Sequence, residues 1–311
     1  MAMSLPPIGN CDTNLTRSWD PPMFRCPSCR EPLRSLEISA DTSCRECQFT
    51  IPAIEGVPLL VKDLRVIERT IEKAKRASRD DWFQAPQINQ WSGPYRHHVL
   101  KRKLYVEGVL STYISRCKGD VIGLDLGCGD GANIEWLSQH FTALYASDYN
   151  LVRLRRARHR HGAEMVYMAD ILDYPAIDNT FSVIYFNHVL EHIPNDSRAL
   201  AEVYRILKPG GRVVLGVPNE GAMFWQLAYR FQPSTGATTD HVHFYTAGSL
   251  RKKCEESGFT VLQVVPIGWG LPHWSLDAAV RGVKFIDDLL DRIGRVVAPS
   301  QATSLYLILS K

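Results

Sequence analysis

The chain has 311 residues, of which 45% are hydrophobic and 22% are charged, and its formal net charge is +3. This composition is typical of a globular protein with room for one large domain and a small one. The net charge is too small to indicate a nucleic-acid-binding protein by itself. No run of about 18 apolar residues is present, so no transmembrane helix is predicted.

Residues 1–23 combine no basic stretch with an apolar core, so they do not have the pattern of a secretory signal. We expect a disordered lead-in there. The chain has eight cysteines, four of which are scattered outside the clustered pairs considered next. This usage favours a reduced protein, and we expect it in the cytoplasm.

Residues 24–62 hold two Cys-x2-Cys pairs with fourteen residues between them, and the four cysteines are Cys26, Cys29, Cys44 and Cys47. Four thiolates form the shell that Zn²⁺ prefers in structural sites. A full tetrahedral shell leaves no water to activate, so we expect zinc to stabilise a segment too short for a core of its own. A redox role is less favoured, because no βαβ pattern surrounds the cysteines.

Residues 63–118 are interpreted as a helical linker with helices that cover the cofactor. Charged residues among apolar residues at helical spacing predict a solvated helix over 62–80, and a second helix is predicted over 96–116. The aromatic segment 82–96 is broken by Pro and Gly and predicts a loop. That loop either covers a ligand or packs as part of the linker, and Arg96 is a candidate cofactor contact within it.

From residue 119 onward, strand and helix patterns alternate, which predicts a parallel sheet with helices on both faces. Ligands of such sheets bind beyond the carboxyl ends of the strands. The predicted strands are 120–125, 142–147, 164–168, 181–186, 211–217, 259–265 and 303–309, and the predicted helices are 131–139, 150–160, 196–207 and 246–257.

The stretch LDLGCGDG joins the first of these strands to its helix. A glycine turn of this kind usually holds the pyrophosphate of a dinucleotide at the helix N-terminus. Here Asp125 ends the strand and Asp130 lies in the turn, and both would repel a phosphate. S-adenosylmethionine (SAM) fits better, because it carries an ammonium and a sulfonium and no phosphate.

The next two strands also end in acids. Asp148 lies 23 residues after Asp125, where a carboxylate can accept hydrogen bonds from both ribose hydroxyls. Asp170 ends the third strand and can reach the amino group of adenine. The sequence therefore predicts a SAM site built from three successive strand ends.

The motifs LDLGCGDG, ASD, MAD, FSVIYFNHVLEHI and LKPGGRVVLGVPN resemble those of class I SAM-dependent methyltransferases, nearest to the type 11 and UbiG-like group. The Cys-x2-Cys tail with Pro52, Gly56 and Pro58 resembles a Trm112-like zinc ribbon. These resemblances imply an α/β fold, namely a Rossmann-like seven-stranded methyltransferase sheet with an antiparallel last strand, and a small N-terminal zinc-ribbon domain. The methyltransferase domain would span 119–311, with substrate-covering insertions at 218–245 and 266–299.

The same resemblance implies roles for individual residues. The implied cofactor contacts are Asp125, Gly127 and Gly129 at the methionine end, Asp148 and Tyr149 at the ribose, Asp170 and Ile171 at the adenine, and Asn187 beside both cofactor and substrate.

Methyl transfer to a hydroxyl requires a group that accepts its proton, and histidine is suited to that near neutral pH. His188 is the first candidate and His241 the second, followed by His192. For each of them, a helix cap or a hydrogen bond to the backbone is the alternative. The UbiG-like pattern EVLEH has a glutamate where this chain has His188, so no divalent metal is predicted to assist.

The aromatic insertions favour a small apolar, aromatic or lipid-linked acceptor. The amphipathic segment 276–297 is expected to pack against the domain rather than against a membrane. An RNA methyltransferase that recognises rRNA or tRNA through the zinc ribbon is the alternative, and the five arginines of RLRRARHRH at 153–161 favour it. A non-catalytic methyltransferase-like scaffold is the third possibility.

Overall fold

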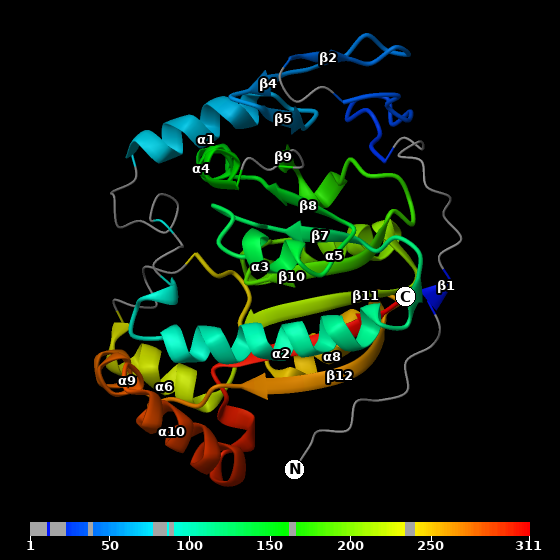
Figure 1. The fold of residues 1–311 in the computed structure, drawn as a ribbon. Coiled ribbons are helices and arrows are strands. Elements are labelled where there is room, and N and C mark those ends of the chain that lie inside the picture. Colours follow the sequence, from blue (N-terminus) through cyan, green and yellow to red (C-terminus); the bar gives the residue numbers. More distant parts are fainter. Residues whose placement is uncertain are drawn as a thin grey trace.

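The computed structural model describes residues 11–12, 23–36, 40–76, 86, 90–161, 166–233 and 240–311. A central sheet has the strand order β12-β13-β11-β10-β7-β8-β9-β5-β4 and is covered by helices on both faces (Figure 1). Its strands are β4 (Ala53–Ile54), β5 (Val57–Leu60), β7 (Ile122–Leu126), β8 (Ala143–Asp148), β9 (Val166–Ala169), β10 (Phe181–Asn187), β11 (Leu207–Pro218), β12 (Thr260–Ile267) and β13 (Ser304–Ser310).

The helices and the short strands complete the described chain. The α-helices are α1 (Arg65–Arg76), α2 (Arg96–Ile114), α3 (Ile134–Ser138), α4 (Leu151–His161), α5 (Asp196–Ile206), α6 (Met223–Phe231), α8 (Ala247–Glu256), α9 (Trp274–Arg281) and α10 (Lys284–Val297). The 3₁₀ turns are η2 (Ile171–Asp173), η3 (Leu190–His192) and η4 (Pro299–Gln301). Short strands β1 (Cys11–Asp12) and β6 (Cys117–Lys118) pair in parallel, and β2 (Thr42–Ser43) pairs antiparallel with β3 (Thr50–Ile51).

The seven strands expected from the sequence lie together in this sheet. Strands β7, β8, β9, β10 and β11 are parallel, whereas β13 runs antiparallel to both β11 and β12. The antiparallel last strand is therefore confirmed. The first two residues of the predicted strand 164–168 lie outside the described residues, and β9 begins at Val166.

Two further strands extend the sheet beyond these seven. β5 pairs in parallel with β9 through Leu59 and Leu60, and β4 pairs antiparallel with β5. All four residues of β5 are buried, as expected for a parallel strand covered on both faces. The segment after the four cysteines thus continues the sheet.

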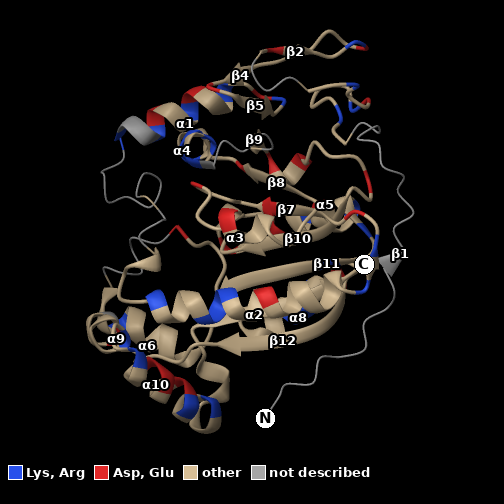
Figure 2. Cartoon of the chain, in the orientation of Figure 1, with Lys and Arg blue, Asp and Glu red and all other residues tan. Residues whose placement is uncertain are grey.

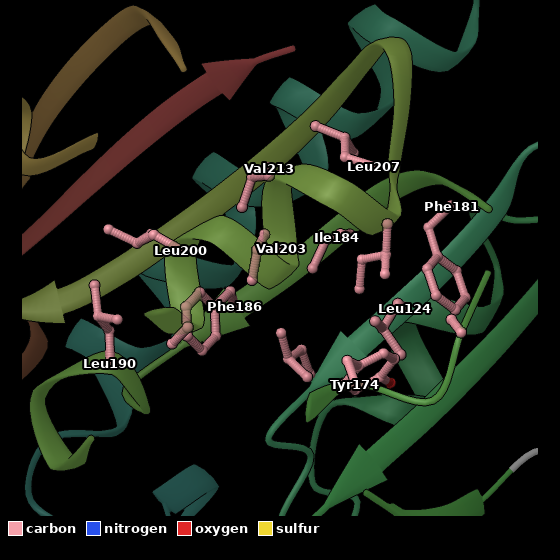
Figure 3. Close-up of a cluster of buried hydrophobic side chains, with 14 of the residues drawn as sticks. Leu124, Tyr174, Phe181, Ile184, Phe186, Leu190, Leu200, Val203, Leu207 and Val213 are labelled. Atoms are coloured by element: carbon pink, nitrogen blue, oxygen red, sulfur yellow. The ribbon is translucent and has the colours of Figure 1, made fainter. Parts of the chain in front are cut away.

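The core lies on both faces of the sheet because its strands are almost continuous apolar runs. On one face, Val203 of α5 packs near Ile184 and Phe186 of β10 and Val213 of β11 (Figure 3). The cysteine segment joins this core through Phe24, whose ring meets Tyr167 edge-to-face with centroids 4.9 Å apart. Among the described helices, none is both long and apolar enough to cross a membrane.

Candidate active site

A cavity of about 710 Å³ opens at the carboxyl ends of β7, β8, β9 and β10. This volume suits a nucleoside-sized ligand together with a small second molecule. Eight of the residues predicted for the site line it, and they are Gly127, Asp148, Tyr149, Asp170, Ile171, His188, His192 and His241. The structure therefore brings residues from five separate segments of the chain to one place.

The glycine turn after β7 contributes Gly127 to the lining of this cavity. The backbone N–H groups of Gly127 and Cys128 both donate to the carbonyl of Ser147 on β8, at 2.8 and 3.0 Å. Gly127 has a φ of +80°, and a Cβ at this position would lie 2.2 Å from the Val189 side chain. Only glycine fits this close approach and this backbone conformation.

Two of the acids at the strand ends are electrostatically coupled. Asp125 is buried, and its Oδ2 finds no hydrogen-bond partner among the described residues. Burial raises the pKa of Asp125 to about 8, and the charge of Asp148 adds to this effect. The Asp148 carboxylate accepts from the N–H of Gly129 at 2.8 Å and from the N–H of Asn150 at 2.7 Å. A cation bound beside these groups would be stabilised by both.

Asp170 lies at the end of β9 and lines the cavity next to Ile171. Its Oδ1 accepts from the N–H of Leu172 at 2.9 Å and so caps η2. This bond fixes the orientation of the carboxylate. Tyr149 follows Asp148 on the rim of the same cavity and is exposed.

His188 follows β10 directly and has a φ of +54°, a conformation that few non-glycine residues adopt. Its Nε2 lies 2.5 Å from Nη1 of Arg102 on α2, and its Nδ1 lies 3.3 Å from Oε1 of the buried Glu191. Because a guanidinium can only donate, Nε2 is the acceptor, which assigns the proton to Nδ1 facing Glu191. Burial lowers the pKa of His188, and the charge of Arg102 lowers it further, although Glu191 opposes both effects.

His192 and His241 lie against each other, with ring centroids 4.6 Å apart. Nδ1 of His192 is 2.8 Å from a carboxylate oxygen of Asp240, and Nδ1 of His241 is 2.7 Å from one of the buried Glu220. Burial disfavours the charged form of His241, yet the contact with Glu220 and the charges of Glu191 and Asp240 together raise the pKa of His241. The two candidate histidines His188 and His241 thus have pKa values shifted in opposite directions, which favours different protonation states.

Glu191 also lies close to this pair. Ligand-type atoms of Glu191, His192 and His241 are all within 4.8 Å of one another. The buried carboxylate therefore adds negative charge beneath both imidazoles, in addition to the carboxylates that orient them.

Four predicted cofactor contacts, namely Arg96, Asp125, Gly129 and Asn187, are not among the residues that line the cavity, and the side chains of two of them bind elsewhere. Arg96 is not among the residues that line the cavity, and its guanidinium donates to the carbonyls of Gly93 and Gly282 at 3.3 and 2.5 Å. The side chain of Asn187 accepts from the hydroxyl of Tyr306 at 2.6 Å and points toward β13. Arg96 was expected from its place in the 82–96 loop and Asn187 from its place after the fourth strand, but both side chains bind to neighbouring elements.

Sequence reasoning missed Arg102, Glu220 and Asp240, which contact the three histidines. Glu220 follows the carboxyl end of β11, so the strand-end argument that found Asp148 could also have found it. Arg102 lies inside a helix without any motif, and its contact with His188 joins positions 86 residues apart. No local signal predicts such a contact.

The four cysteines of the N-terminal segment form a compact cluster. Sγ of Cys26 is 3.6 Å from Sγ of Cys47, and Sγ of Cys29 is 3.7 Å from Sγ of Cys44. A tetrahedral zinc ion with Zn–S bonds of about 2.3 Å places its sulfurs roughly 3.8 Å apart. The donor set and its spacing therefore fit zinc.

Comparisons with known proteins show sequence similarity to methyltransferases. The chain is 31% identical over 143 residues to a malonyl-[acyl-carrier protein] O-methyltransferase of Erwinia billingiae, covering 45% of this chain and 54% of that protein. It is 35% identical over 98 residues to the ubiquinone/menaquinone biosynthesis C-methyltransferase UbiE of Desulfotalea psychrophila, covering 31% and 40%. The matches thus span about half the length of these relatives.

A solved structure of an S-adenosylmethionine-dependent methyltransferase from Mesorhizobium loti is similar to this one. It aligns with a TM-score of 0.46 and 21% identity, covering 62% of this chain and 92% of that one. Residues 95–264, which are 170 of the 311 residues, match the family described as a methyltransferase domain. Because that match covers more than half of the chain, the chain belongs to the S-adenosylmethionine-dependent methyltransferase family.

Proposed function

We propose that this protein transfers the methyl group of SAM to a hydroxyl oxygen of a small apolar, aromatic or lipid-linked acceptor. One observation carries the proposal. Asp148 and Asp170, the acids at the ends of β8 and β9, share a single cavity with three histidines, and the buried Asp125 of β7 directly precedes the lining residue Leu126. Negative charge suits a sulfonium nucleoside, and imidazoles suit removal of a hydroxyl proton.

The residues of the cavity fit the cofactor on grounds of charge. Asp125 has a raised pKa, and its Oδ2 lacks a hydrogen-bond partner among the described residues. Its carboxylate would therefore be stabilised by a nearby cation. An ammonium at this place would favour the ionised carboxylate. Asp148 and Asp170 are held by backbone N–H groups and retain acceptor capacity for hydroxyl and amino donors. SAM, when bound, supplies an electrophilic methyl group and a neutral leaving group.

His188 would accept the hydroxyl proton at Nε2. Its lowered pKa keeps the imidazole neutral at pH 7, and the contact of Nδ1 with Glu191 would stabilise the imidazolium that forms. In this structure the guanidinium of Arg102 already donates a hydrogen bond to Nε2 of His188. The acceptor hydroxyl must therefore take the place of the guanidinium, which could then donate elsewhere in the cavity.

Two features favour a small acceptor over RNA. Leu172, Val189, Ile193 and Pro194 add an apolar part to the cavity wall. Arginines of α4 that could engage phosphates are used within the molecule instead. Arg155 pairs with Glu55 of the N-terminal segment, and Arg160 donates to the Asp130 carbonyl at 3.2 Å.

The test is transfer of tritium-labelled methyl groups from SAM to a metabolite extract and, separately, to total RNA. We expect label in the organic-soluble fraction of the extract. Label in RNA alone would replace this proposal with the RNA methyltransferase. No label in either sample, together with no SAM binding, would favour the non-catalytic scaffold.

A further inference from the structure

Helix α10 has an unusual polarity, because its apolar side is exposed. The residues Phe285, Leu289, Ile293, Val296 and Val297 recur every three or four positions and therefore share one side of the helix, here called the apolar face of α10. Their exposed fractions are 74, 42, 51, 82 and 76%. The expectation that this segment packs its apolar residues against the domain is thus wrong for this face.

The opposite side of α10 is acidic and buried. Asp287 and Asp291 are both bound by Lys101 of α2, the latter at 2.7 Å. Nε of Arg281 donates to Asp287 at 2.8 Å, and the N–H of Trp269 donates to Asp291 at 2.9 Å. Figure 2 shows the acidic residues of α10 on its side toward α2. These bonds fix the rotation of the helix, so the apolar face is turned outward by a specific network.

The exposed charges of α10 are mainly positive. Lys284, Arg292 and Arg295 are exposed and form a row beside the apolar face. Asp288 lies in the same row and is neutralised by Lys284 at 2.6 Å and by Lys101 at 3.1 Å. Lys284 is paired with Asp288, so the cations that flank the apolar stripe are Arg292 and Arg295, the latter also lying over the Trp269 ring at 5.2 Å, and the six charged residues of the helix sum to zero.

We propose that the apolar face of α10 docks on an anionic lipid bilayer. A helix that lies in a membrane interface has this combination, with apolar side chains in the acyl boundary and cations at anionic headgroups. The two flanking arginines favour an anionic lipid surface over a second copy of the chain, because a two-fold contact through this face would bring Arg292 and Arg295 of both copies to one interface.

The docking surface and the cavity are connected through α2. Lys101 holds α10, and the next residue, Arg102, contacts His188 in the cavity. Docking would place α10 parallel to a lipid surface, and α2 would connect α10 to the cavity. The inference rests only on α10 and its partners, so it does not depend on the proposed reaction.

Binding to sonicated vesicles of phosphatidylglycerol and phosphatidylcholine, measured by co-sedimentation at low salt, tests the proposal. We expect binding that is lost in pure phosphatidylcholine and weakens as salt is added. Leu289→Asp should reduce partitioning at least about tenfold. Arg292→Glu should reduce it at least about fivefold, the effect of one cation near the surface.

The matched controls lie on the other side of the molecule. Leu64→Asp and Arg65→Glu change exposed residues of the same types near α1 and should leave partitioning unchanged. Equal thermal unfolding of all variants excludes misfolding. The proposal is overturned if the wild type does not bind anionic vesicles, or if the α10 variants bind as well as the controls.

Sedimentation velocity without lipid gives the second readout. A dimer that becomes monomeric in Leu289→Asp would show that this face joins two copies instead, and this also overturns the proposal. Transfer to a water-soluble acceptor should be equal in all these variants, so failure of lipid binding and failure of the proposed reaction are distinguishable.

Discussion

Asp125 is the residue whose pKa should respond most directly to the charge of the cofactor. Its pKa is about 8 because it is buried beside Asp148. A bound ammonium would lower this pKa, so binding should release a proton between the lowered pKa of the complex and about pH 8. We therefore expect the affinity for SAM to rise with pH, by up to about tenfold per unit, until pH 8.

Calorimetric titrations between pH 6 and 8 measure this slope. In Asp125→Asn the slope should vanish, because the amide does not titrate, and the affinity at pH 8 should fall. A slope that persists in the variant would assign the proton to another group.

His188 is expected to act as the proton acceptor. His188→Asn keeps a residue type that tolerates the left-handed backbone but removes the base. We expect a fall of about 10²- to 10⁴-fold in the rate of transfer with little change in SAM affinity. The base must be unprotonated, and burial lowers the pKa of His188 below 6.5. The wild-type rate should therefore decline only below about pH 6.5.

Rates of single-turnover transfer across pH 5 to 8 test this assignment. A variant that retains the wild-type rate would show that His188 only shapes the backbone after β10. His241, whose pKa is raised, would then be the group to examine.

At the scale of residues, the position of acids and histidines after strands, together with the motifs around them, predicted eight of the residues that line the cavity. It placed Asp148, Asp170 and His188 at the carboxyl edge because parallel strands end on the same side of a sheet. It failed for Asn187, whose side chain turns toward Tyr306. The choice between cavity and sheet depends on the packing of a strand more than a hundred residues away, which one sequence does not reveal.

At the scale of elements, the pairing of β5 with β9 links the cysteine cluster to the cavity. β9 ends next to Asp170, and β5 lies against it through Leu59 and Leu60. We therefore propose that a zinc ion held by the four cysteines stabilises the protein and that its loss would also weaken SAM binding, since the adenine end of the cavity would lose its support.

Cys44→Ser tests this coupling. We expect loss of bound zinc by elemental analysis, a lower melting temperature and weaker SAM binding. Cys117→Ser is the matched control, because Cys117 lies outside the cluster, and it should keep zinc and affinity. Unchanged SAM binding in a zinc-free Cys44→Ser protein would show that the two parts are independent.

The sequence predicted seven of the nine strands of the sheet. It did not predict the pairing of β5 with β9 or the side of α10 that faces inward. The β5–β9 pairing joins residues over a hundred positions apart, so periodicity carries no signal for it. In the 276–297 segment, the sequence indicated an amphipathic stretch expected to pack against the domain, whereas the structure forms α9 and α10 there and exposes the apolar face of α10. Lys101 and Arg281 decide this by binding the acidic side, and neither belongs to α10.

At the scale of the whole molecule, one sheet of nine strands connects the cysteine cluster, the cavity and the C-terminal helices. The account depends on the acids at the ends of β7, β8 and β9, which should select a sulfonium nucleoside over a phosphorylated one. Calorimetry of the full chain with SAM and with NAD⁺ measures this selection directly. We predict saturable binding of SAM, no detectable binding of NAD⁺, and weaker SAM binding in Asp148→Asn. Binding of NAD⁺ that equals or exceeds that of SAM would contradict the account.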